Sequence, residues 1–374
     1  MRVYFNLLIA VITAFVFSIA PSFALPQLLI DMRTGEVLYE QDAGVAWHPA
    51  SLTKLMSAFV VFEAIKAGRI NLETPVIISA KAQKVPPSKS GLPRDTAISV
   101  RDALFMIIIK SANDISIALA ETVSGSEEKF VAEMNQMAEV LGLTATHFVN
   151  SNGLHKNAQV VSARDMAILA LNIKIRHANY DALFATAEVI LGEKKLKTHN
   201  NLLTEFAGTN GMKTGFVCAA GLNIVASVKR NGRSLMVVIL GASSARERGE
   251  MAAQLLLKGF SGNLKGQGKS VKNIRNIIGS KAVNMRPMIC GEEAKAYVAQ
   301  REVQFPYGLE GQQSFLSQRI MAQSKRVKIL GKMRNVPYPR IRPYHEAKFV
   351  EKTLELRGSL GITPLPRPRP IQLY

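Results

Sequence analysis

At residues 48–56 the chain reads HPASLTKLM, and this stretch opens a long apolar run that ends at Gly68. Residues three apart lie on one face of a helix, so a helix that begins here presents the hydroxyl of Ser51 to the amine of Lys54. A serine hydroxyl is a weak nucleophile that needs a base, and lysine serves as one where burial lowers its pKa. Because the residues after Lys54 are strongly apolar, we expect a buried helix, and a buried lysine requires an explanation. The alternative is an N-cap serine followed by a solvated lysine.

Two later motifs add polar groups that suit a binding site. Ser111-Ala112-Asn113 follows an apolar run, where a hydroxyl and an amide on a tight bend can both point inward; an N-cap serine is the alternative. Lys213-Thr214-Gly215 stands at the start of a predicted strand, where a charge and a hydroxyl suit a carboxylate and glycine allows close approach. A phosphate-binding loop is excluded, because it needs glycine directly before the lysine and Met212 occupies that position.

The flanking segments predict strands at both ends of one domain, with helices between them. Residues 27–30 and 36–40 are apolar runs joined by a turn with a glycine, which predicts a hairpin. Residues 216–228 and 234–240 are β-branched and apolar and predict two strands joined by a turn. Helices are expected at 51–67, 101–109, 111–123, 127–141, after Ser162 and at 246–260, and short strands at 74–78 and 96–100. This order predicts an α+β domain with one antiparallel sheet from both ends and a helical cluster packed on it.

In their order along the chain, S-x-x-K, S-x-N and K-T-G resemble the motifs of the penicillin-recognising serine acyl transferases. These are the penicillin-binding proteins and the serine β-lactamases. Within this superfamily, residues 25–262 resemble a low-molecular-mass D-alanyl-D-alanine carboxypeptidase, which implies a β-lactamase/transpeptidase-like fold. Supporting stretches are THFVNSNGLH at 146–155, SARDMAILA at 162–170, NNLL at 200–203, GMKTGF at 211–216 and AAGLNIVAS at 219–227.

The resemblance implies the catalytic roles of three residues. Ser51 attacks the carbonyl of the penultimate D-alanine of a peptidoglycan stem peptide and forms an acyl-enzyme. Lys54 takes the proton of Ser51, and Ser111 relays a proton to the leaving D-alanine. Water then hydrolyses the acyl-enzyme, and β-lactam antibiotics act as covalent inhibitors. No cofactor and no metal are implied.

The resemblance also implies the residues that bind the substrate. Asn113 holds the substrate amide, and Lys213 and Thr214 bind the terminal carboxylate. Gly215 lies between them and Phe216, whose backbone N–H forms an oxyanion hole with that of the nucleophile. The family commonly has histidine and threonine after K-T-G, whereas Phe216 and a valine stand here.

Three other functions fit the same motifs. Two are enzymatic, a DD-endopeptidase that cuts crosslinks and a β-lactamase, although no acidic residue suited to deacylation is evident before K-T-G. The third is a non-catalytic peptidoglycan-binding protein that has kept the fold. The presence of all three motifs argues against it.

The N-terminus predicts export. Residues 5–20 form an apolar run after Met1-Arg2, and small residues at the −3 and −1 positions precede a cut after Ala24. We therefore expect a signal peptide at 1–24, with an uncleaved anchor as the alternative, and a protein in the periplasm or on the outer face of the cytoplasmic membrane. The two cysteines, Cys218 and Cys290, fall in what look like different domains, so two free or buried thiols are expected; a disulfide remains open to an exported protein.

The charge of the chain is concentrated at its C-terminal end. The net charge is +19, of which residues 263–374 carry +14 and residues 1–262 carry +5. We expect 263–374 to be a basic, partly disordered region that ends in an extended, proline-rich tail. Its charge suits an anionic envelope polymer or lipid headgroups. Nucleic acid is an unsuitable partner for an exported protein.

Overall fold

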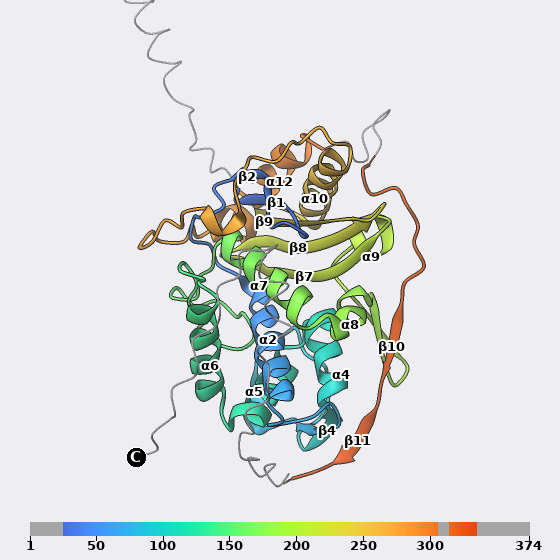
Figure 1. The fold of residues 1–374 in the computed structure, drawn as a ribbon. Coiled ribbons are helices and arrows are strands. Elements are labelled where there is room, and N and C mark those ends of the chain that lie inside the picture. Colours follow the sequence, from blue (N-terminus) through green and yellow to red (C-terminus); the bar gives the residue numbers. More distant parts are fainter. Residues whose placement is uncertain (1–24, 306–313, 335–374) are drawn as a thin grey trace, which may run out of the picture.

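The central sheet unites the two ends of the domain. The computed structural model describes residues 25–305 and 314–334. Its largest sheet has five strands in the order β2-β1-β9-β8-β7 (Figure 1). The strands are β1 (Gln27–Asp31), β2 (Val37–Gln41), β7 (Thr209–Val217), β8 (Gly221–Arg230) and β9 (Arg233–Ala242). Each neighbouring pair is antiparallel. The predicted hairpin and the predicted sheet from both ends of the domain are therefore confirmed.

Helices cover both faces of this sheet. In β9 every residue from Leu235 to Ala242 is buried. α10 (Ala245–Phe260) lies on one face, and α7 (Ala163–Arg176) lies on the other with the rest of the helical region (Figure 1). A strand buried on both faces has a continuous apolar sequence, which is why residues 235–240 are apolar throughout.

The helix that follows Ser51 forms the centre of the helical region. After a 3-10 turn, η1 (Ala50–Leu52), α2 (Thr53–Lys66) is buried at every position from Thr53 to Phe62. It packs against α5 (Asn113–Ser124), α6 (Glu127–Val140) and α7. The expected burial of this helix is confirmed, so Lys54 lies in the interior of the protein.

Shorter elements complete the described part of the fold. The helices are α3 (Ala80–Lys84), α4 (Val100–Phe105), a π-helical turn η2 (Met106–Lys110), η3 (Ala178–Tyr180), α8 (Asp181–Ala185), α9 (Leu202–Glu205), η4 (Val271–Asn273), α11 (Arg286–Cys290) and α12 (Ala294–Glu302). One small sheet joins β3 (Pro75–Ile77), β4 (Thr96–Ser99) and β11 (Ile329–Lys332), and another joins β5 (Glu188–Leu191), β6 (Lys194–Lys197) and β10 (Ser324–Val327). Within residues 25–305 and 314–334, no helix has the length and apolarity needed to cross a membrane.

The residues after 262 pack against the domain that precedes them. β10 pairs in parallel with β5, and β11 pairs antiparallel with β4, so this segment runs along one side of the molecule (Figure 1). Arg301 of α12 pairs with the fully buried carboxylate of Glu247 in α10 at 2.7 Å. The basic C-terminal region thus contributes strands and buried contacts as far as residue 334. The predicted tail beyond that point and the predicted signal peptide at 1–24 lie outside the described residues.

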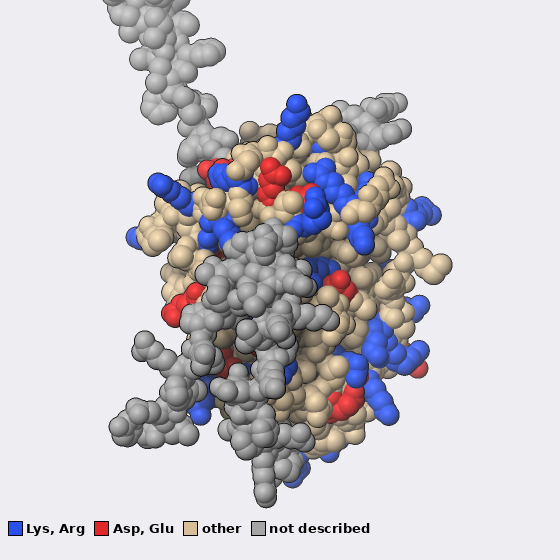
Figure 2. Space-filling view, viewed as in Figure 1, with Lys and Arg blue, Asp and Glu red and all other residues tan. Residues whose placement is uncertain are grey.

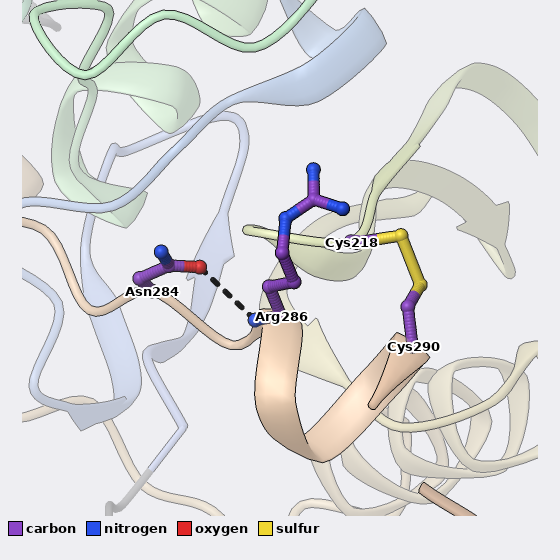
Figure 3. The surroundings of a disulfide bond; sticks show 4 residues. All are labelled: Cys218, Asn284, Arg286 and Cys290. Atoms are coloured by element: carbon purple, nitrogen blue, oxygen red, sulfur yellow. Dashed lines mark hydrogen bonds between the residues drawn. A yellow bond between two sulfur atoms is a disulfide. The ribbon is translucent and has the colours of Figure 1, made fainter. Parts of the chain in front are cut away.

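The prediction of two free or buried thiols is wrong. Cys218 and Cys290 form a disulfide, with their Cα atoms 5.7 Å apart (Figure 3). The backbone N–H of Met285 also donates to the carbonyl of Ala219 at 3.0 Å, which holds the chain just before α11 against the turn between β7 and β8. The prediction assumed that the cysteines lie in separate domains. Packing of the C-terminal region against the end of the sheet brings them together instead.

The apolar run at residues 216–228 predicts one strand, but the structure has parts of two. The chain turns between the end of β7 at Val217 and the start of β8 at Gly221, whose φ of +65° suits glycine. β7 begins at Thr209, so Lys213-Thr214-Gly215 lies in the middle of a strand and not at its start. The turn residues Ala219 and Ala220 are fully buried, which gives them the apolar character of a strand.

Candidate active site

Ser51 and Lys54 meet at the start of the buried helix α2. Ser51 lies in η1, and the Nζ atom of Lys54 is 3.1 Å from its Oγ atom. The same Nζ donates to Oδ1 of Asn113 at 2.8 Å and to the backbone carbonyl of Asn152. A neutral amine has two N–H bonds and one lone pair. The two carbonyl-type acceptors therefore use both N–H bonds, which leaves the lone pair for the hydroxyl proton of Ser51.

The electrostatics of Lys54 favour this neutral form. Its side chain has no exposed surface, and burial lowers its pKa well below the usual range. The positive charge of Lys213 lowers the pKa further, while the carboxylate of Asp114 acts in the opposite direction. The lowered pKa favours the neutral amine, and a neutral amine can act as a general base toward Ser51.

A second hydroxyl–amine pair faces the first. Ser111 follows η2 with a left-handed backbone (φ 62°, ψ 36°), a conformation that non-glycine residues adopt mainly where the surroundings enforce it. Lys213 Nζ donates to Ser111 Oγ at 3.1 Å and to the carbonyl of Thr214 at 2.8 Å. Burial, together with the nearby guanidinium of Arg248, lowers the pKa of Lys213 to about 7. At neutral pH, Lys213 is therefore present in both its charged and its neutral form.

A second buried cation lies near Lys213, at a position that no motif of the sequence indicated. Arg248 of α10 is 3% exposed; its Nη2 donates to the carbonyl of His199 at 2.5 Å, and burial lowers its pKa to about 10. Burial lowers the pKa of His199, and the charges of Lys213, Arg248 and Lys110 lower it further. In the described part of the chain, neither Lys213 nor Arg248 pairs with a carboxylate, and Arg248 Nε is buried without a partner. This surplus of positive charge suits an anionic group of a ligand.

Strand β7 passes directly beside the nucleophile. A Cβ atom on Gly215 would lie 2.8 Å from the carbonyl oxygen of Pro49 and 3.0 Å from the backbone nitrogen of Ser51. Only glycine permits this approach without a shift of the backbone. Thr214 is buried, whereas Phe216 is 52% exposed at the surface next to the nucleophile.

A loop on the other side of Ser51 supplies residues that the motifs did not identify. Gly153 has a φ of +89°, and a Cβ atom there would lie 2.0 Å from the carbonyl oxygen of Ala50. The preceding residue, Asn152, provides the carbonyl that accepts from Lys54. Both belong to the stretch NSNGLH, so the resemblance contained a signal for them, although no role followed from it.

Contacts join all the residues that the sequence singled out. Lys54 connects Ser51 with Asn113, Asn113 stands two residues after Ser111, and Ser111 contacts Lys213. Thr214, Gly215 and Phe216 continue from Lys213 along β7 and return to the nucleophile at Gly215. The site holds a serine hydroxyl, a buried amine in contact with it, a second hydroxyl and two buried cations. Among the described residues, no group of three or more His, Cys, Asp or Glu side chains is placed to hold a metal ion.

Fold and site together define the class of penicillin-binding, β-lactamase-like proteins that act through a serine. The chain belongs to the D-alanyl-D-alanine carboxypeptidase family, whose model matches residues 21–244. The D-alanyl-D-alanine carboxypeptidase DacF of Bacillus subtilis is 36% identical over 239 residues, which is 63% of this chain and 61% of that protein. The match therefore spans about three-fifths of this curated relative.

Solved structures share the fold. The D-alanyl-D-alanine carboxypeptidase DacD of Francisella tularensis aligns with a TM-score of 0.63 and 28% identity, over 65% of this chain and 72% of that one. Penicillin-binding protein D2 of Listeria monocytogenes, in its cefotaxime-bound form, aligns with a TM-score of 0.58 and 29% identity, over 64% of this chain and 99% of that one. The predicted fold class and family are thereby confirmed.

Proposed function

We propose that the protein is a serine-type D-alanyl-D-alanine carboxypeptidase that removes the terminal D-alanine from peptidoglycan pentapeptides. The observation that carries this proposal is the 3.1 Å contact between Ser51 Oγ and the Nζ atom of a fully buried Lys54, whose pKa burial lowers. The family to which the chain belongs supports the choice of substrate.

In the acylation step, Lys54 accepts the Ser51 proton while Oγ attacks the carbonyl of the penultimate D-alanine. The oxyanion is held by the backbone N–H groups of Ser51 and Phe216, and such a donor contributes about 10²–10³-fold in rate. Ser111 donates a proton to the amine of the departing D-alanine as the C–N bond breaks, and is reprotonated from Lys213. An acyl-enzyme and free D-alanine result.

The terminal carboxylate of the substrate binds beside the buried cations Lys213 and Arg248. Lys213 and Thr214 contact it, with the positive charge of Arg248 behind Lys213. Asn113 positions the substrate amide from its place beside Lys54. Water then attacks the acyl carbonyl and loses a proton through Ser111 to Lys213, while Lys54 returns its proton to Ser51 and the shortened stem peptide is released. β-Lactams acylate the same serine, and their opened ring blocks this water step.

The domain organisation follows from the same proposal. Residues 1–24 act as a signal peptide that exports the chain to the periplasm or the outer face of the cytoplasmic membrane. Residues 25–262 form the catalytic domain. Residues 263–374 form the basic C-terminal region, of which the described part packs on the catalytic domain as far as residue 334.

A muropeptide assay tests the reaction. The purified protein is incubated with a monomeric pentapeptide muropeptide and with a crosslinked dimer, and the products are separated by mass. Release of D-alanine from the monomer, lost in Ser51→Ala and kept in Ser57→Ala, is the expected result; Ser57 lies on the same helix but donates to the Ser151 carbonyl instead. Cleavage of the dimer alone would replace the proposal by an endopeptidase. The absence of both products would exclude a DD-peptidase.

A further inference from the structure

A basic surface adjoins the site, on a small sheet assembled from two distant parts of the chain. In the sheet β10-β5-β6, Ile190 of β5 stands between Lys195 of β6 and Arg326 of β10. Lys197 lies two residues beyond Lys195 and therefore on the same face. We name as the basic face the exposed residues Lys195, Lys197, Arg326 and Lys328. Figure 2 shows Lys and Arg side chains gathered on the side of the molecule where Figure 1 places β10.

Cations outnumber carboxylates on this face. Among residues 25–305 and 314–334, none of the four cations takes part in an ion pair. The acidic residue in the same sheet is Glu188, which stands opposite Lys197. Lys195 and Arg326 are two strand spacings apart, about 10 Å, and like charges this close repel. An anionic partner would remove this repulsion.

The basic face is continuous with the cations of the active site. β6 ends at Lys197, and His199 follows two residues later with its carbonyl bound by Arg248. The hairpin of β5 and β6 also packs on η2, whose last residue, Lys110, directly precedes Ser111. Lys110, Arg248 and Lys213 all act electrostatically on His199, so they lie close around it. Positive charge thus extends from the exposed strands to the buried Arg248 and Lys213.

We propose that the basic face binds the carboxylates of neighbouring stem peptides on one uncrosslinked peptidoglycan strand while a single stem peptide occupies the active site. The proposal deepens the proposed function and rests on it. Each uncleaved stem peptide ends in a carboxylate, so the polymer is a polyanion, whereas an isolated peptide presents one such group to the site. Contacts to neighbouring stems raise the effective concentration of the next substrate. The field of the face also attracts the polymer before it binds.

The experiment compares two matched triple variants with the wild-type protein. Lys195→Gln, Lys197→Gln and Arg326→Gln together neutralise the centre of the basic face. Lys265→Gln, Arg275→Gln and Lys281→Gln together remove the same charge from an exposed segment on the opposite side of the molecule (Figure 1). None of these residues belongs to the catalytic machinery.

Each protein is assayed on pentapeptide-rich insoluble peptidoglycan and on a soluble acylated tripeptide that ends in D-alanyl-D-alanine. Both activity assays, and a sedimentation assay on the insoluble polymer, are run at about 0.02 M and about 0.5 M salt. Salt screens the interaction between exposed charges beyond about 10 Å at 0.1 M and beyond about 3 Å at 1 M, so an electrostatic effect weakens at the higher concentration. We expect the first triple variant to lose roughly 10-fold in kcat/KM on the polymer at low salt, within the range of electrostatic steering. Its activity on the tripeptide stays at the wild-type level, and the loss disappears at high salt.

Three results would overturn the inference. They are wild-type activity of the first variant on the polymer, an equal loss on the tripeptide, and an equal loss in the second variant. Failure of the proposed function is distinguishable, because a wild-type protein that releases no D-alanine from either substrate refutes it. Sedimentation still decides the inference in that case: equal binding of the wild type and the first variant to the polymer at low salt would refute it.

Discussion

Replacing Lys213 by methionine is expected to make the protein more stable at neutral pH. Lys213 is 2% exposed, and burial with the charge of Arg248 lowers its pKa from 10.5 to about 7. In the unfolded chain the amine keeps its ordinary pKa. Between about pH 7 and 10.5 the unfolded state therefore binds a proton that the folded state has lost, and stability rises with pH across this window. At ~1.36 kcal/mol per pKa unit, the difference favours unfolding by about 5 kcal/mol below pH 7.

Methionine has a similar length and no charge, so it removes this penalty. It also removes the hydrogen bonds to Ser111 and the Thr214 carbonyl, each worth about 1 kcal/mol. The expected net gain is about 3 kcal/mol near pH 6. It falls as the pH rises through 7, reaches zero near pH 9 and becomes a loss of about 2 kcal/mol above pH 10.5.

Urea unfolding followed by circular dichroism, at intervals from about pH 6 to pH 10, measures the difference between variant and wild type. Lys265→Met, at an exposed position, serves as the control and is expected to show no such dependence on pH. A Lys213→Met variant that is less stable than wild type near pH 6 would refute the reasoning. A difference that stays constant across the pH range would refute it equally.

Three further predictions concern the site and its support. Arg248→Gln removes a positive charge that lowers the pKa of Lys213, so the alkaline limb of the pH profile of β-lactam acylation is expected to move to higher pH; an unmoved limb would contradict the coupling. Gly215→Ala places a Cβ atom against the backbone of the Ser51 turn and is expected to slow acylation by a fluorescent penicillin about 10²-fold or more, with an unchanged circular dichroism spectrum; near-wild-type acylation would show that the close approach is dispensable. Replacing both Cys218 and Cys290 by serine removes a disulfide that spans 72 residues. The free energy of unfolding is expected to fall by about 4 kcal/mol, while the variant still binds penicillin. A loss below about 1 kcal/mol would show that the bond constrains the unfolded chain little.

The motif residues could be predicted because the chemistry fixes their types and their local spacing. Ser51 and Lys54 stand three apart on a helix whose apolar sequence already required burial, and the structure places both as expected. The sheet could be predicted for a similar reason, since continuous apolar runs at both ends of the domain have to pack together. The signals for the helix pair and for the strands are visible in the local pattern of residue types along the chain.

Other parts of the site depend on contacts between distant segments. Arg248 stands on an amphipathic helix, and nothing in the pattern of α10 shows that this position faces His199 and the active site. The disulfide of Cys218 and Cys290 required the C-terminal region to pack against the end of the sheet, which charge and composition do not indicate. The turn after Val217 was hidden because its alanines are buried and resemble a strand.

Covalent labelling shows whether Ser51 is a nucleophile that Lys54 activates. The protein is incubated with benzylpenicillin, and the adduct is located by mass spectrometry of its peptides. We predict one penicilloyl group on Ser51 in the wild type, none in Ser51→Ala, and strongly slowed labelling in Lys54→Ala. An unlabelled wild type, or a Ser51→Ala variant labelled as fast as wild type, would contradict the account.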